Sequence, residues 1–268
     1  MTSTAKAFRA LARAGFRRSS SYRAATVAGI FTNSIFGFFG VAILLAALEA
    51  GGGEIAGYTR TDAITYTWIT QGLIGTLAVW GWVDLATRIQ TGDIVTDLQR
   101  PVDLQFMYIS EDYGRAAYQF LARGIPPFLV GMAFYTLTFP SDLGQWCAFA
   151  VSIVLAVAVS FGLRFIVNLL AFWVLDWRGI QNLSQAIVTV ASGFVVPLAF
   201  FPEPLERLLM VLPWASLVQV PVDVFLGKRT GATLASGLAL QCFWALALLL
   251  IGRVLLQRAT LRVVVQGG

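Results

Sequence analysis

The sequence predicts an all-α integral membrane protein with six transmembrane helices and both termini in the cytoplasm. Its 268 residues are 57% hydrophobic and 12% charged, whereas about a quarter of the residues of a soluble domain carry charge. Six stretches of at least about 20 mostly uncharged residues recur along the chain, and each is long enough to cross a hydrocarbon core of about 30 Å. The chain is therefore expected to fold within a bilayer.

Two residue counts exclude much enzyme chemistry. The chain has no histidine, which removes Ser-His and Cys-His nucleophiles, the histidine zinc motifs and the commonest proton shuttle near neutral pH. Its two cysteines, Cys147 and Cys242, lie in apolar runs and are interpreted as small buried hydrophobes. No metal, cofactor or catalytic residue is expected in this chain.

Residues 1–23 form a basic segment ahead of the first span. At helical spacing, Arg9, Arg13 and Arg17 share one face. Another face carries Phe8, Leu11, Gly15 and Phe16. This pattern predicts an amphipathic helix on an anionic inner leaflet. The alternative is a disordered basic arm that only fixes orientation.

The expected membrane domain covers residues 24–262 and is followed by a tail at 263–268. Its six predicted spans are residues 24–48, 63–83, 116–140, 143–175, 179–202 and 230–252. Pro126 and Pro127 should kink the third span. The fourth would reach about 50 Å as one helix at 1.5 Å per residue, so it should protrude or bend, with Gly162 as the candidate position.

The distribution of positive charge decides whether the segment 208–226 is predicted to cross the membrane. With six spans, thirteen Lys and Arg residues lie inside and four outside, as the positive-inside rule requires. A seventh span would move Arg253, Arg258 and Arg262 outside. Residues 208–226 are therefore expected to form a re-entrant or interfacial piece within an outer region, 203–229. This topology also explains the net charge of +5 without any nucleic-acid partner.

The longest inside loop, residues 85–115, contains a predicted short amphipathic helix. Gly92 breaks the preceding helix, Asp93 can cap the new one, and Pro101 ends it. Ile94, Val95 and Leu98 share its apolar face. This face is expected to pack into a groove, either on a partner protein or on the ends of the chain's own membrane helices.

Two arginines fall inside predicted spans, Arg123 and Arg164. Both are near the inner interface, where a long side chain can snorkel toward lipid headgroups or serve a structural role. A substrate counter-ion is the alternative, because charges inside a membrane are costly. Tyr66, Trp68, Trp146 and Trp214 are interpreted as an interfacial aromatic belt.

Three motifs together resemble one family of transporters. Gly92, Ile94, Leu98, Arg100 and Pro101 form the pattern Gly-x-Ile-x-x-x-Leu-x-Arg-Pro. Span five contains Ser-Gly-Phe-Val-Val-Pro-Leu-Ala-Phe-Phe-Pro at 192–202, and Pro-Val-Asp-Val-Phe-Leu-Gly follows at 221–227. Taken in this order along a chain with six predicted spans, the three motifs resemble those of the permease subunits of type-2 ABC exporters. The similar branch is bacterial, with a separate ATPase and often a second, related permease.

The resemblance implies a site for the ATPase in the inside loop. Ile94, Val95 and Leu98 would be the packing contacts, and Asp93, Asp97 and Arg100 would set the register. ATP and Mg²⁺ would bind to the cytosolic partner, since no Gly-Lys-Ser/Thr phosphate loop occurs in this chain. A related second permease is favoured over a second copy of the chain, in a bacterial plasma membrane.

The resemblance also implies an outer gate in span five. Ser192, Gly193 and Pro197 would break the helix, and Phe201 and Pro202 would lead into a return segment from Glu203 toward Val211 that acts as a lid. Ordinary close packing is the alternative for Gly193.

Two other classes of protein compete with this interpretation. An ion-coupled secondary carrier would need an acidic residue or an unwound site at mid-membrane. An intramembrane enzyme acting on lipid would need converging ionisable groups. No predicted span interior offers a carboxylate pair, so the exporter is preferred.

Overall fold

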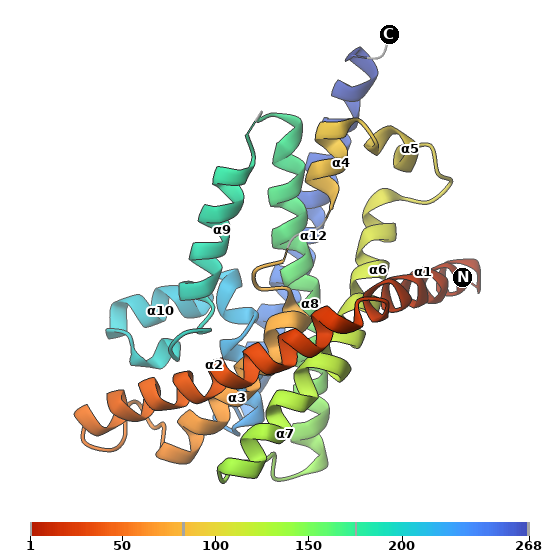
Figure 1. The fold of residues 1–268 in the computed structure, drawn as a ribbon. Helices are drawn as coiled ribbons and strands as arrows, with labels where there is room; N and C mark the ends of the chain where they lie inside the picture. Colours follow the sequence, from red (N-terminus) through yellow and green to blue (C-terminus); the bar gives the residue numbers. More distant parts are fainter. Residues whose placement is uncertain (1, 82–83, 175, 267–268) are drawn as a thin grey trace.

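The computed structural model describes residues 2–81, 84–174 and 176–266, and these residues form helices joined by short irregular segments (Figure 1). The α-helices are α1 (Thr2–Ser20), α2 (Arg23–Ala50), α3 (Arg60–Leu77), α4 (Leu85–Thr91), α5 (Ile94–Leu98), α6 (Leu104–Gln119), α7 (Ile125–Phe134), α8 (Leu143–Leu169), α9 (Arg178–Ala191), α10 (Glu203–Val211), α11 (Gln219–Phe225) and α12 (Gly231–Gln266). A π-helix, η1 (Phe120–Gly124), joins α6 to α7, and three 3₁₀ turns are η2 (Leu170–Phe172), η3 (Leu198–Phe200) and η4 (Pro213–Ser216). The all-helical fold class is confirmed for this part of the chain.

Three helical segments among the described residues are long and apolar enough to cross a membrane, Arg23–Ala50, Leu143–Phe172 and Gly231–Leu261. They correspond to the first, fourth and sixth predicted spans. The other three predicted spans fold differently, and membrane crossing by them stays a prediction.

The second and third predicted spans are shifted. α3 ends at Leu77, where Ala78 adopts a left-handed φ of 48°, and residues 82–83 lie outside the described residues. The helical run that contains the third predicted span consists of α6, η1 and α7. It starts at Leu104, within the predicted loop, and ends at Phe134. Pro126 and Pro127 stand in the first turn of α7, which continues directly from the π-helix, and the missing proline N–H groups therefore fall where the regular α-helical hydrogen bonding is already interrupted.

The fifth predicted span is the largest departure from expectation. α9 has 14 residues, so it rises about 21 Å at 1.5 Å per residue and is shorter than a hydrocarbon core of about 30 Å. After α9 the backbone is irregular, except for the 3₁₀ turn η3, until α10 begins at Glu203. The expected return segment from Glu203 toward Val211 forms the helix α10, and its role as a lid stays a prediction.

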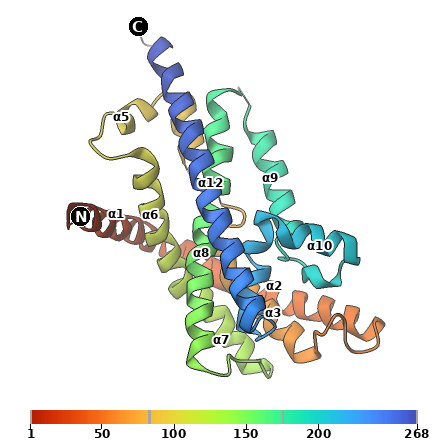
Figure 2. The same ribbon diagram turned by 180° about the vertical axis from the view of Figure 1, so that it is seen from behind.

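α8 lies among the other helices, and α12 packs along it on one side of the molecule (Figures 1 and 2). α11 packs against α8, and its seven residues are all buried. Residues 208–226 thus fold as short helical pieces, the last of which is covered by protein, and their re-entrant or interfacial position on the outer side stays a prediction. α12 continues to Gln266, so the predicted tail at 263–268 is helical through that residue.

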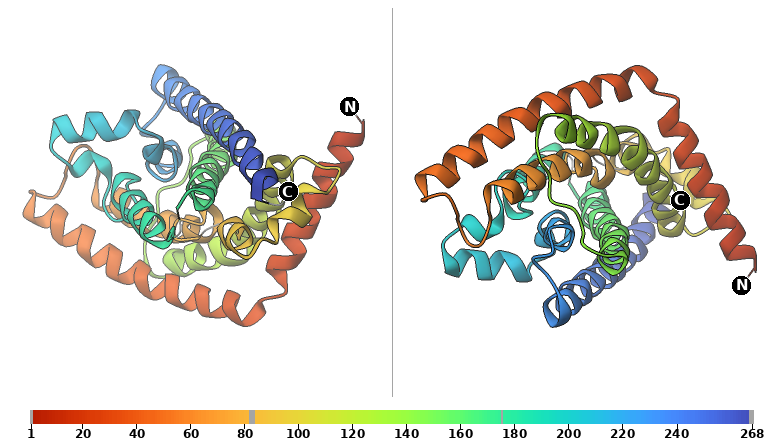
Figure 3. Two further views of the ribbon diagram at one scale, coloured as in Figure 1. Left: turned by 90° about the horizontal axis from the view of Figure 1, so that it is seen from above. Right: turned by 90° about the horizontal axis from the view of Figure 1, so that it is seen from below.

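Viewed from above and below, α1 and α2 meet at a corner and form two sides of an L around the other helices (Figure 3). The predicted amphipathic helix at the N-terminus is confirmed, but its apolar face is occupied by the chain itself. Phe8 packs near Phe106 and Tyr113 of α6, and Gly15 lies directly over the backbone of Glu111. The aromatic belt is corrected as well, because Tyr66 and Trp68 are buried.

Candidate functional site

The loop predicted to lie inside contains two short helices joined at a glycine. Gly92 ends α4 with a φ of 82°, a conformation that favours glycine, and α5 starts two residues later. Asp93 precedes α5 as its cap residue, but its carboxylate accepts a hydrogen bond from the Thr91 hydroxyl at 2.8 Å instead of capping the helix. The predicted helix is confirmed, although it ends at Leu98, before Pro101.

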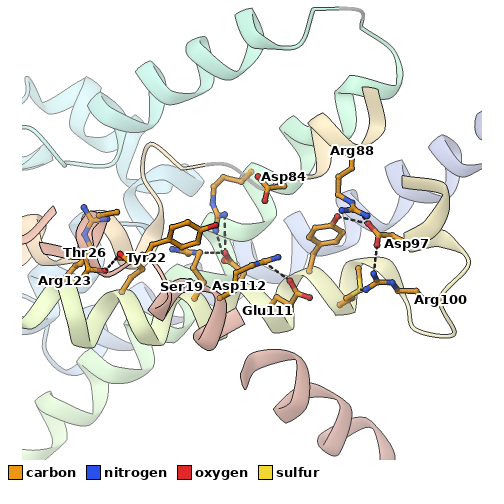
Figure 4. A pocket seen from close by; sticks show the side chains of 17 residues that line it. Ser19, Tyr22, Thr26, Asp84, Arg88, Asp97, Arg100, Glu111, Asp112 and Arg123 are labelled. Atoms are coloured by element: carbon orange, nitrogen blue, oxygen red, sulfur yellow. Dashed lines mark hydrogen bonds and ion pairs between the residues drawn. The ribbon is translucent and has the colours of Figure 1, made fainter. Parts of the chain in front are cut away.

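Asp97 holds the loop together. Its carboxylate is buried and accepts hydrogen bonds from Arg88 Nε at 2.6 Å and from the Tyr108 hydroxyl at 3.2 Å. Arg100 Nη2 lies 3.5 Å from the other carboxylate oxygen, Asp97 Oδ1 (Figure 4). Burial and the charge of Asp97 raise the pKa of Tyr108, so the phenol stays protonated and donates. One carboxylate thus joins α4, α5 and α6.

The apolar face of α5 is divided between the interior and solvent. Ile94 is 2% exposed and packs with Leu85, Leu104 and Met107. Leu98 is half-buried against the same cluster, whereas Val95 is 42% exposed. The exposed remainder of the motif is Gly92, Asp93, Arg100 and Pro101. The surface left for a partner is therefore narrower than the sequence pattern implied.

The loop is fixed to the long helices α8 and α12. The Asn168 side chain of α8 accepts the N–H of Ala86 at 3.0 Å and so satisfies the start of α4. At the start of α6, Asp103 pairs with Arg253 of α12, and Gln105 Nε2 donates to the Leu249 carbonyl at 2.8 Å. A displacement of the loop would therefore act directly on α8 and α12.

The predicted helix break in the outer gate is present at Ser192 and Gly193. α9 ends at Ala191, and Gly193 has a φ of 82°. A Cβ there would come within 2.6 Å of Tyr66 Oη and Gln219 Oε1. The glycine is thus required by its backbone conformation and by close packing together.

Gln219 of α11 connects the broken segment to the core. Its backbone N–H donates to the Ser192 carbonyl at 3.0 Å, and its Oε1 accepts the N–H of Leu198 at 2.8 Å. Its Nε2 donates to Tyr58 Oη and to Asp223 Oδ1, each at 2.8 Å. Sequence reasoning missed Gln219 and Tyr58. An amide inside the apolar run 208–226 was the available signal for Gln219, whereas Tyr58 lies in a glycine-rich connection that gives no such signal.

The other predicted gate residues surround this network. Pro197 is buried and precedes η3, Phe201 is half-buried, and Pro202 is exposed and stands before α10. Trp244 Nε1 of α12 donates to the Val211 carbonyl at 2.9 Å, and Gln241 Nε2 donates to the Ser216 carbonyl at 2.8 Å. The outer segment is thereby attached to α12.

The predicted interfacial arginines separate into three groups. Arg9, Arg13 and Arg17 are exposed on α1. Arg164 instead points inward, where its Nη2 lies 2.7 Å from Asp112 Oδ2, so it is a structural ion-pair residue and does not snorkel. Burial alone would raise the pKa of Asp112, but Arg164 and Arg115 lower it to about 2. Arg123, in η1, lies apart from these pairs.

Across the described residues, no three His, Cys, Asp or Glu side chains gather where they could hold a metal ion. Cys147 and Cys242 are free and exposed, contrary to the expected burial.

The long apolar helices define a multi-pass membrane protein. The chain belongs to the ABC-2 family transporter proteins, whose family pattern matches residues 31–267. It is therefore a permease component of an ABC transporter, and the family favours this class over the secondary carrier and the lipid-modifying enzyme. No curated protein matches the chain.

Proposed function

We propose that this chain is the permease subunit of an ATP-driven exporter in a bacterial inner membrane. A separate cytosolic ATPase binds ATP and Mg²⁺, and a second, related permease completes the translocation path. The chain crosses the membrane six times with both termini inside, so that loop 85–115 faces the ATPase and region 203–229 faces outward. The distribution of thirteen and four basic residues supports this orientation.

The exposed edge of α5 is the proposed contact with the ATPase. The observation that carries the proposal is the anchoring of Asp97, which ties α5 to α4 and α6 through Arg88 and Tyr108. Because α6 is bound to α12 through Asp103 and Gln105, closure of two ATP-loaded subunits would move these helices together as a rigid body. Val95 supplies the apolar contact, with Asp93 and Arg100 at its rim.

The segment from Ser192 to Val211 is the proposed outer lid. Gln219 and Tyr66 hold its irregular backbone through hydrogen bonds. These bonds are easier to break than the hydrogen bonds of a continuous helix. Release of these bonds would let the lid move while α8 and α12 stay intact.

The first test is co-purification of the ATPase with a Val95→Asp variant. A carboxylate at a desolvated contact is unfavourable, so we expect at least tenfold less ATPase to be retained and transport to be lost. Membrane insertion should be unchanged, because Val95 is exposed.

Leu205→Asp is the matched control, since Leu205 is 40% exposed on α10 where Val95 is 42% exposed on α5. It should retain the ATPase fully. Equal retention by the Val95→Asp variant would contradict the coupling role of α5. Ile94→Asp is unsuitable for this purpose, because burial of Ile94 would make loop unfolding the cause of any loss.

A further inference from the structure

A cavity of about 480 Å³ lies between the corner of α1 and α2, the face of α6 and the α4–α5 loop (Figure 4). Its charged lining consists of Arg18, Arg88, Arg100, Arg115, Arg123, Arg164, Asp84, Asp97, Glu111 and Asp112. The six arginines exceed the four acids, so the cavity carries a net positive charge. Such a concave basic surface concentrates anions.

Five of the six arginines are already paired. Arg88 and Arg100 share Asp97, Arg115 and Arg164 share Asp112, and Arg18 lies 2.8 Å from Glu111. The exception is Arg123, which forms no ion pair or side-chain hydrogen bond within the part of the chain that the structure describes. Its Nε is buried and lacks a hydrogen-bond partner. A cation held in this way calls for an anionic ligand.

The fold makes specific room for Arg123. It projects from the π-helix η1, and such bulges often redirect side chains at functional sites. Gly29 of α2 lies against its guanidinium, so a Cβ at Gly29 would be 2.0 Å from Arg123 Nη2. Thr26, whose hydroxyl lies 2.9 Å from the Tyr118 hydroxyl, stands beside Arg123 at the same end of the cavity (Figure 4).

We propose that this end of the cavity binds the phosphate of an anionic phospholipid, with Arg123 as the principal ligand. Guanidinium geometry matches phosphate oxygens in a bidentate manner. Lipid is favoured over free phosphate because the helices that bound the cavity continue into exposed apolar side chains. Val27 and Phe31 are exposed on α2, and Leu121 and Ile125, each two residues from Arg123 in sequence, are exposed on η1 and α7. Acyl chains have a surface to follow on either helix.

The test is calorimetric titration of the detergent-purified chain with dihexanoyl phosphatidylglycerol, dihexanoyl phosphatidylcholine and inorganic phosphate. We expect the anionic lipid to bind at least tenfold more tightly than the zwitterionic lipid. Arg123→Gln should weaken that binding at least tenfold. Arg60→Gln removes an exposed arginine of the Glu49 pair and should leave the affinity unchanged.

Gly29→Ala is the second informative variant, because it keeps every charge and helix while its methyl group displaces the guanidinium. It should also weaken binding of the anionic lipid. Inorganic phosphate that competes with equal affinity would support the phosphate site but assign it to free phosphate. Equal affinity for the two lipids, or unchanged affinity in Arg123→Gln, would overturn the proposal. Neither result depends on the coupling role of α5.

Discussion

At the scale of single residues, the structure gives two polar side chains of apolar segments, Tyr66 and Arg164, specific partners. Tyr66 and Trp68 fitted an interfacial belt by sequence, yet both are buried, and Tyr66 donates to the Gly193 carbonyl. Arg164 fitted a snorkelling residue and instead pairs with Asp112. Composition identifies such residues as unusual, but their partners lie far away in sequence, so only the fold can identify them.

Gly193→Ala tests the conformation at the end of α9. A methyl group would meet Tyr66 and Gln219, and φ is 82°. We therefore expect destabilisation of at least about 1 kcal/mol, measured as a lower Tm of the purified chain in detergent.

Gly179→Ala is the control at the other end of α9, where nothing lies within 4 Å of the added carbon. It should be neutral or stabilise the helix by up to about 1 kcal/mol. Equal Tm values for the two variants would refute the requirement for glycine at position 193.

At the scale of helices, hydropathy located the cores of the elements better than their ends. The first, fourth and sixth spans were predicted well because apolar length alone defines them. The start of α6 was missed, because Glu111, Asp112 and Arg115 lie inside the helix that Asp103 caps, and uncharged length was the signal for a span. The fifth span was predicted too long, since the residues after Gly193 are as apolar as those of a membrane-spanning helix but fold as irregular backbone.

The crossing of α1 over α6 depends on two glycines. A Cβ at Gly114 would be 1.8 Å from the Ala12 carbonyl oxygen, and one at Gly15 would be 2.1 Å from that of Glu111. Both contacts are with backbone, so neither can be relieved by a side-chain rotation. The two helices can therefore approach this closely only with glycine at these positions.

Gly114→Leu should separate α1 from α6. Trypsin should then cleave after Arg9, Arg13 and Arg17 at least severalfold faster, because a detached helix opens more readily. Ala14→Leu, on the exposed face of α1, should leave the cleavage rate unchanged. Identical rates for both variants would mean that this crossing does not hold α1.

At the scale of the whole molecule, the proposed orientation rests on charge, and cysteines introduced on either side can measure it once the two exposed native cysteines are removed. With Cys147 and Cys242 replaced by Ala, Gln99→Cys should react with an impermeant maleimide only in inverted vesicles. Glu206→Cys should react in intact cells. Reaction of both positions from the same side would exclude the six-span topology.

α12 gives the proposed contacts a thermodynamic link. Gln241 and Trp244 bind the Ser216 and Val211 carbonyls, and Arg253, about 14–18 Å further along the same helix, binds Asp103. If a displacement of α12 shifts both contact sites between two states, a coupling free energy joins them, and such coupling is reciprocal. Cargo that opens the lid would then change the affinity for the ATPase by the same factor by which the ATPase changes the affinity for cargo.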